Sequence, residues 1–207
     1  MLHTPAGRLL VFSYGTASAG VPERWRATPE RPGVNLLPEP TDAEADRVIA
    51  QVDAHRAEGD RVVVSVHWGA NWGYDVPEAQ RRFAHRLIIA GAADVVHGHS
   101  SHHPKGIEVH RGRLVLYGAG DFLNDYEGIG GHEAYRPHLT AAYLPVLGAD
   151  GALASMELAP MRIRRLRLAR ASPEDAGWLA DRLTREGRPF GTRVLQVDEG
   201  RLRLDCD

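Results

Sequence analysis

Residues 61–67 read RVVVSVH, a short valine-rich run that ends in a histidine. An apolar run of this length predicts a buried β-strand rather than a helix. A capping-box sequence, TDAE at residues 41–44, predicts a preceding helix that continues to about Glu58. The spacing of apolar residues predicts another helix after the strand, over residues 77–91. A strand placed between two helices indicates an α/β layered fold.

Further strands are expected on both sides of this unit. Residues 8–14 and 94–96 predict short strands, and residues 15–40 predict a long loop. The second half is β-rich, with strands expected at residues 107–109, 114–117, 139–147, 153–158 and 163–168, then a helix over 172–186 and a hairpin from 194–197 and 202–204. We therefore expect a layered domain over residues 1–170, followed by a helix and hairpin appendage over 171–207.

Composition limits the classes of function. A net charge of −2 across 207 residues gives no basic surface for nucleic acid, and the alternating arginines of residues 162–170 fit a half-exposed strand. Cys206 is the only cysteine, so a disulfide framework is excluded. No apolar run approaches the ~18 residues of a membrane span, and the N-terminal residues lack a secretory pattern. We expect a cytoplasmic chain as written, or an envelope-associated one if a further N-terminal segment exists.

Histidines gather at the predicted strand ends. The chain has 11 histidines, and five of them lie between His97 and His110. In open α/β sheets the C-terminal ends of the strands face the ligand crevice, and imidazole is a common metal ligand near neutral pH. His67 ends one strand, while His99 and His102 lie three residues apart in a glycine-containing turn after the next. Each histidine alone would more often be structural, but together the three predict a metal site.

Three motifs in residues 62–126 resemble those of a known family. They are HWG at residues 67–69, GHSSHHP at 98–104 and YGAGDF at 117–122. Their order and spacing are similar to those of the CapA family of poly-γ-glutamate capsule-synthesis proteins, relatives of the calcineurin-like metallophosphoesterases. A weaker resemblance extends over residues 8–145. It implies a metallophosphoesterase-like sandwich, a divalent Mn, Fe or Zn ion, a phosphoester or acidic-polymer partner, and a hydrolase.

The resemblance also suggests roles for individual residues. The predicted metal ligands are His67, His99 and His102, the candidate catalytic groups are His103 and Asp121, and the candidate substrate contacts are Trp68, Asn71 and Asn124. Asp125 and Glu127 are further candidate carboxylates beside Asp121. These acids could bind metal, orient the histidines or cap a turn. Trp68 and Trp72 could equally stack on a substrate or pack in the core.

Two departures from the family pattern affect these expectations. Asn71 stands where the family usually has a glutamate, and an amide cannot act as a base. The family's opening Gly-Asp strand and Asn-Asn-His segment, which supply its first metal ligands, have no counterpart before Arg8. The chain therefore resembles the C-terminal portion of a CapA domain, N-terminally truncated. We expect an exposed sheet edge, covered by self-association or by a partner segment. Three interpretations stay open: a hydrolase, a factor that binds acidic polymer without cleaving it, and a degenerate fragment.

Overall fold

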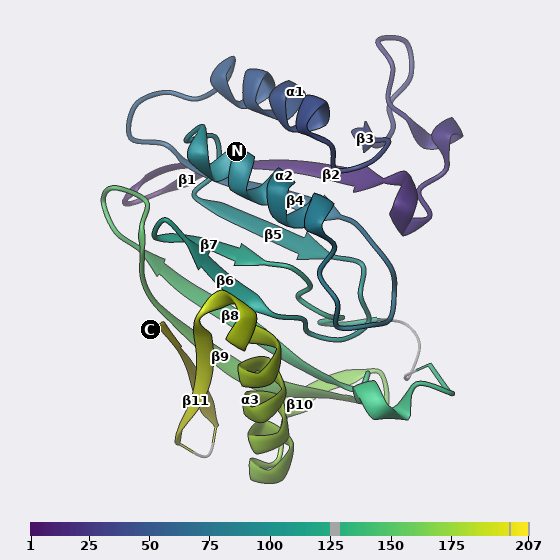
Figure 1. Ribbon diagram of the computed structural model, residues 1–207, viewed down its shortest axis with the longest axis vertical. Helices are drawn as coiled ribbons and strands as arrows, with labels where there is room; N and C mark the ends of the chain where they lie inside the picture. The colour runs from purple at the N-terminus through teal and green to yellow at the C-terminus, as the bar shows by residue number, and fades with distance from the viewer. Residues whose placement is uncertain (125–128, 199, 207) are drawn as a thin grey trace.

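The computed structural model describes residues 1–124, 129–198 and 200–206. Within them, one mixed sheet has the strand order β1-β2-β4-β5-β7-β6, with β3 beside β2 (Figure 1). Its strands are β1 (Leu2–Thr4), β2 (Gly7–Thr16), β3 (Leu36–Leu37), β4 (Arg61–His67), β5 (Val95–His99), β6 (Ile107–His110) and β7 (Arg113–Leu116). Strands β2, β4, β5 and β7 run parallel. A helix connects β2 to β4 and another connects β4 to β5, as parallel neighbours usually require.

Helices α1 (Asp42–Asp53) and α2 (Glu78–Ile89) cover one face of this sheet (Figure 1). The predicted N-cap of α1 is confirmed, because the Thr41 side chain accepts a hydrogen bond from the Glu44 amide. The predicted end at Glu58 is wrong. The helix stops at Asp53 because the following residues turn the chain into β4, where the amide of Ala57 donates to the Asp60 carboxylate at 2.8 Å.

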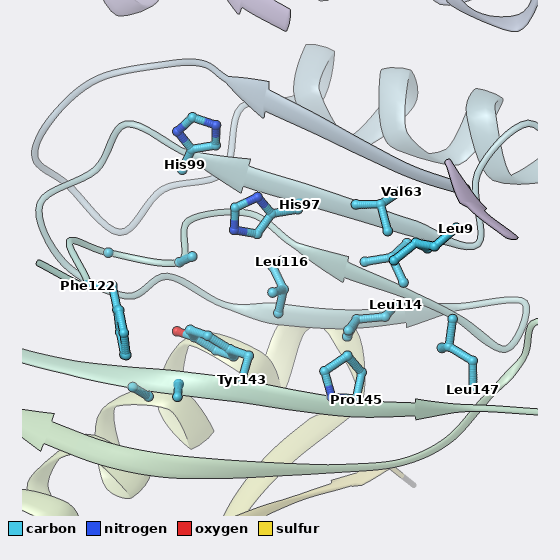
Figure 2. Close-up of a pocket in the computed structure, with 15 residues that line it drawn as sticks. Leu9, Val63, His97, His99, Leu114, Leu116, Phe122, Tyr143, Pro145 and Leu147 are labelled. Carbon is cyan, nitrogen blue, oxygen red and sulfur yellow. The ribbon is translucent and has the colours of Figure 1, made fainter. Parts of the chain in front are cut away.

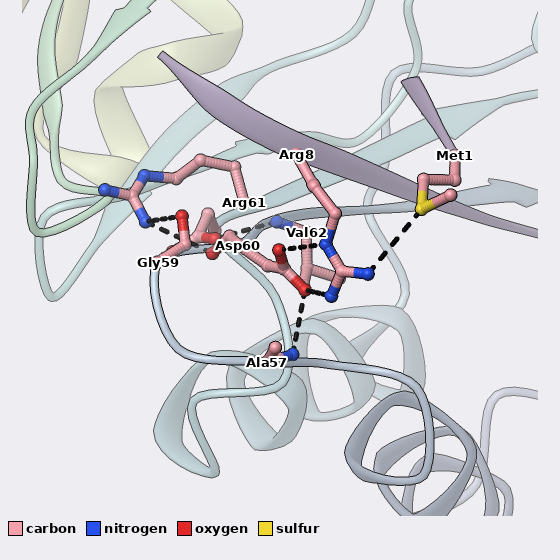
Figure 3. Close-up of polar contacts among 8 residues, drawn as sticks. Met1, Arg8, Ala57, Gly59, Asp60, Arg61 and Val62 are labelled. Carbon is pink, nitrogen blue, oxygen red and sulfur yellow. Dashed lines mark hydrogen bonds and ion pairs between the residues drawn. The ribbon is translucent and has the colours of Figure 1, made fainter. Parts of the chain in front are cut away.

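An ion pair between Arg8 and Asp60 joins the first residues of β2 to the start of β4 (Figure 3). The Arg8 Nε donates to Asp60 Oδ1 at 2.7 Å, and a second guanidinium nitrogen contacts Oδ2. The Asp60 side chain is only 4% exposed, and the hydrogen bond from Arg8 is the main reason that its pKa is lowered. This contact supports the parallel register in which Leu9 pairs with Arg61.

The second half of the chain forms an antiparallel sheet, also as expected. Its strands are β8 (Leu139–Leu147), β9 (Leu153–Arg164), β10 (Arg167–Arg170), β11 (Thr192–Asp198) and β12 (Arg201–Cys206). The two strands predicted over residues 153–168 have the wrong boundaries, because β9 continues through Pro160. Strand β12 pairs with β9 at Glu157 and Leu158, and β10 pairs with it from Met161 onward. Pro160 lies between these pairings, where a missing N–H is tolerated.

The described residues from 171 onward pack against the rest of the chain. Helix α3 (Pro173–Gly187) and strands β11 and β12 contribute to an apolar core shared with β5, β6, β7 and β9. The Thr192 hydroxyl also donates to the carbonyl of Ile107 in β6, at 2.7 Å. Among the described residues, no helix is long and apolar enough to cross a membrane.

Alternation along the strands assigns each side chain of the first sheet to one of its two faces. In β4, Val62, Val64 and Val66 pack in the core under α1 and α2, whereas Val63 packs toward the second sheet. In β5, Val96 faces the helices and Val95 faces the second sheet. The histidines at the ends of these strands follow the same parity, so they lie on the face away from the helices.

Candidate functional site

His67 and His99 lie side by side where β4 and β5 end. They are register partners in the parallel ladder, and their Nδ1 atoms are 3.2 Å apart. The sequence placed His99 after its strand, but β5 extends to His99 because its ladder with β4 continues that far. His97 lies two residues earlier on the same face, where its Nδ1 contacts the Ser65 hydroxyl at 3.0 Å.

Burial keeps these imidazoles uncharged near neutral pH. The pKa of His99 is lowered to about 4, mainly by burial and further by the neighbouring His97 and His67. Burial is also the main cause that lowers the pKa values of His67 and His97. An uncharged imidazole carries the free lone pair that a metal ligand needs. The His67–His99 pair can therefore donate to a divalent ion, but His67, His99 and His102 are not a set whose ligand atoms all lie within 4.8 Å of one another, and they provide no carboxylate to bridge a second ion.

The third predicted ligand, His102, lies in the turn that follows β5. Its Nδ1 is 2.9 Å from Oδ2 of Asp121, and the Asn124 amide donates to the same oxygen at 3.0 Å. The backbone amide of His102 donates to the carbonyl of Asn71 at 3.0 Å, which ties this turn to the loop after β4. His102 is close enough for its charge to lower the pKa of His67. The predicted carboxylates Asp125 and Glu127 lie outside the described residues.

The other predicted residues occupy different surroundings. Trp68 is 2% exposed, and its indole N–H donates to the carbonyl of Tyr117 at 3.0 Å, so it packs in the core. His103 is 1% exposed and stacks on Tyr135 with ring centroids 4.6 Å apart. Burial lowers the pKa of His103 to about 4. Asn71 is exposed beside the His102 turn.

Two hollows meet at His99. Figure 2 shows an apolar cavity between the sheets, of about 660 Å³, with His97 and His99 at one end and Leu9 and Leu147 at the other. Its remaining walls are largely aliphatic and aromatic. A second hollow of about 600 Å³ is lined by His67 and His99 together with Tyr14 and Trp25. A ligand at the histidine pair can therefore be approached from either side of His99.

Sequence reasoning missed a second histidine cluster, formed by His85, Glu108 and His110. Among the described residues, this is the set in which three candidate ligand atoms lie within 4.8 Å of one another. The signal in the sequence was the spacing of Glu108 and His110, which places both on one face of a strand. His85 gave no such signal, because its nearness depends on how α2 packs against β6.

The chain has close counterparts among known proteins. Residues 1–126 match the family model described as bacterial capsule synthesis protein PGA_cap. Over 199 residues, or 95% of the chain, it is 50% identical to a probable polyglutamine synthesis accessory protein of Mycobacterium tuberculosis, and the match covers 52% of that relative. The chain thus spans about half the length of these curated relatives.

Two more distant relatives have names that also refer to PGA or capsule biosynthesis. The PGA biosynthesis protein CapA of Bacillus subtilis is 34% identical over 83 residues, which are 40% of this chain and 22% of that protein. The capsule biosynthesis protein CapA of Bacillus anthracis is 30% identical over 99 residues, 48% of this chain and 23% of that protein.

Proposed function

Because the chain belongs to the PGA_cap family of bacterial capsule synthesis proteins, we propose that it assists the synthesis of a poly-glutamate polymer through a metal-dependent phosphoester hydrolase site. The names of its relatives support the polymer, since they refer to polyglutamine synthesis, PGA biosynthesis and capsule biosynthesis. The observation that carries the site is the pairing of the uncharged His67 and His99, with Nδ1 atoms 3.2 Å apart at adjacent strand ends.

In this proposal His67, His99 and His102 hold one divalent ion of Mn, Fe or Zn. A divalent ion held there supplies Lewis acidity toward a phosphoryl oxygen. Asp121 is a positioning residue, because its Oδ2 lies 2.9 Å from Nδ1 of His102 and so fixes the orientation of that imidazole. Asn124 holds the same carboxylate oxygen of Asp121 and so keeps it aimed at His102.

The proposal gives roles to two further groups, His103 and Asn71. His103 has a pKa of about 4, so it is uncharged at neutral pH, and its Nε2 has no hydrogen-bond partner among the described residues. It is therefore a candidate proton acceptor. The exposed Asn71 lies next to the His102 turn and is a candidate substrate contact, through its amide.

Metal analysis and hydrolysis of an aryl phosphate test this proposal together. The purified chain, supplied with Mn²⁺, Fe²⁺ or Zn²⁺, should retain metal and cleave the ester. His99→Ala and His102→Ala should lose both properties, whereas His3→Ala, at an exposed position in β1, should keep them. Because the chain holds another histidine cluster, metal is counted as the difference between each variant and the unaltered chain. No difference in metal and no hydrolysis would contradict the proposal.

A second candidate function is binding of an acidic polymer without hydrolysis. The β9–β10 hairpin exposes Arg164, Arg165, Arg167 and Arg170, and Arg164 faces Arg167 across the ladder. Among the described residues, none of these four joins an acidic side chain in an ion pair. Such a cluster attracts a polycarboxylate, with an affinity that salt weakens.

Binding of poly-γ-glutamate separates the two candidates. If the arginines carry binding, the affinity should persist in His99→Ala and His102→Ala and fall in the double variant Arg164→Glu/Arg167→Glu. The matched control is Arg24→Glu, a charge reversal at an exposed position in another part of the fold. An equal loss in the control and in the hairpin variant would contradict this second function.

A further inference from the structure

His85, Glu108 and His110 meet between helix α2 and edge strand β6. The Nε2 atom of His85 lies 3.0 Å from both carboxylate oxygens of Glu108. The Nδ1 atom of His110 lies 3.9 Å from Oε1 of Glu108. The two imidazole rings are stacked, with centroids 3.7 Å apart and planes inclined by only 7°. One ligand atom from each of the three residues lies within 4.8 Å of those of the other two.

The fold places this cluster apart from the histidine pair of the proposed function. Ile107 packs in the core shared with the second sheet, so by strand alternation Glu108 and His110 lie on the opposite face, toward α2. His67 and His99 lie on the face away from the helices, and β7 separates β5 from β6 in the strand order. The two groups therefore lie on different faces of one sheet.

We propose that His85, Glu108 and His110 form a zinc site that ties helix α2 to strand β6. Two histidines and one glutamate are a known zinc donor set that leaves a fourth position for water. Tetrahedral ligands about 2.0–2.2 Å from zinc lie roughly 3.3 Å from one another. Here the nitrogens of His85 and His110 lie 3.0 Å and 3.9 Å from Glu108 oxygens, and the ligand atoms of all three residues lie within 4.8 Å of one another. Zn²⁺ takes the place of the proton between His85 and Glu108.

Burial distinguishes the cluster from an ordinary surface ion pair. The Glu108 side chain is 9% exposed and each histidine side chain is 22% exposed. The hydroxyl of Tyr117, a fully buried residue, donates to Oε2 of Glu108 and fixes the carboxylate in place. Such a partner behind a ligand is typical of metal sites. The Nε2 of His110 is buried without a hydrogen-bond partner among the described residues, so no hydrogen bond there competes with an ion for this nitrogen.

Zinc titration of the metal-stripped chain, followed by bound zinc and by Tm, tests the proposal. An ion that binds only the folded state raises the melting temperature. His85→Gln and His110→Gln should each bind one zinc fewer per chain than the unaltered protein and should lose the corresponding rise in Tm. Tyr117→Phe should bind that zinc about 10–100-fold more weakly. The double variant His67→Gln/His99→Gln should retain it, which separates this site from the proposed hydrolase site. His3→Gln is the control for removing an exposed histidine.

A second measurement on the unaltered protein does not depend on the variants folding. Zn²⁺ should protect His85 and His110 from modification by diethyl pyrocarbonate, while the exposed His3 stays reactive. Equal zinc content in His110→Gln and the unaltered chain would overturn the proposal. Equal modification of His85 and His110 with and without Zn²⁺ would overturn it as well.

Discussion

The carboxylate of Asp121 holds the imidazole of His102, with Oδ2 2.9 Å from Nδ1. The two residues come from different loops, one after β5 and one after β7, so the contact also joins the two loops beside the histidine pair. The contact fixes the orientation of the His102 ring, and a carboxylate in this place is typical of a metal-binding histidine. The contact makes Asp121 the most informative residue for testing the proposed hydrolase site.

Asp121→Asn should weaken metal binding at this site about 10–100-fold, because the amide no longer fixes the tautomer of His102. The measurement is a competition titration of metal against a chromophoric chelator, with the His85→Gln background removing the other cluster. Asp53→Asn, at an exposed position near the end of α1, is the matched control. An unchanged metal affinity in Asp121→Asn would show that this carboxylate does not position His102.

Stability of the metal-free chain should fall as the pH is lowered from about 6.5 to about 4. Folding lowers the pKa values of His99 and His103 from 6.5 to about 4, mainly through burial. Within this window the unfolded chain binds more protons than the folded chain, so protonation favours unfolding. Above it, both states carry uncharged imidazoles and the full stability is present.

Urea midpoints measured across this pH window check the effect. His99→Gln and His103→Gln should each reduce the slope of stability against pH, whereas His3→Gln should leave it unchanged. Carboxylates also lose stability in acid, so the difference between each variant and the unaltered chain is the quantity to compare. Identical slopes in all four proteins would contradict a pKa lowered by burial.

Gly98→Ala should destabilise the chain by about 1–3 kcal/mol, because extra atoms do not fit a packed core. A Cβ at position 98 would lie 2.7 Å from the backbone oxygen of Leu116 and would also meet the indole nitrogen of Trp68. The matched control is Gly130→Ala, where nothing lies within 4 Å of the added Cβ. Thermal and urea unfolding of both variants should show a loss for Gly98→Ala alone.

We also expect the chain to self-associate or to need a partner segment at the outer edge of β2. Strand β1 pairs with Gly7–Leu9 and β3 with Gly15 and Thr16, and among the described residues no strand pairs with residues 10–14 on that side. Val11 is 43% exposed there. Open edges of this kind favour pairing with another chain.

Light scattering after size exclusion measures this tendency. The unaltered chain should be larger than a monomer, and Val11→Lys should shift it toward monomer, because a charge on an edge strand opposes pairing. Arg24→Lys serves as a surface control. A monodisperse monomer for the unaltered chain at high concentration would count against the expectation.

Much of the first sheet could be predicted because its signals are local. The valine-rich run of residues 61–67 and the capping residue Thr41 each act over a few neighbours, and the strand and the helix start that they predict are confirmed. The end of α1 could not be read in this way. It depends on Asp60, whose partner Arg8 is distant in the sequence and nearby only after folding. The boundaries predicted around Pro160 are wrong for the same reason. A strand can continue through a proline only where no neighbouring strand needs its N–H, and this depends on which strands pair with β9.

The candidate sites show the same difference between local signals and contacts that form only on folding. The His67–His99 contact follows from two strand ends that are neighbours in a parallel sheet, so the placement of these two side chains is readable from the sequence, while their role as metal ligands with His102 stays a prediction. The sequence allows Trp68 either to pack in the core or to stack on a substrate. Its burial and its hydrogen bond to the carbonyl of Tyr117 show that it packs in the core. His85 joins Glu108 only through packing of a helix on a sheet, and no short motif encodes that contact.

The parallel pairing of β2, β4 and β5 has a consequence for the order of folding. Hairpins such as β8–β9 and β11–β12 join neighbouring segments, whereas β2 and β4 pair only after the whole intervening segment with α1 has been closed into a loop. Contacts between distant segments form slowly. The two histidines at the ends of β4 and β5 likewise meet only after the segment with α2 has closed, so a metal ion that needs both of them binds only chains in which these two strands are already paired.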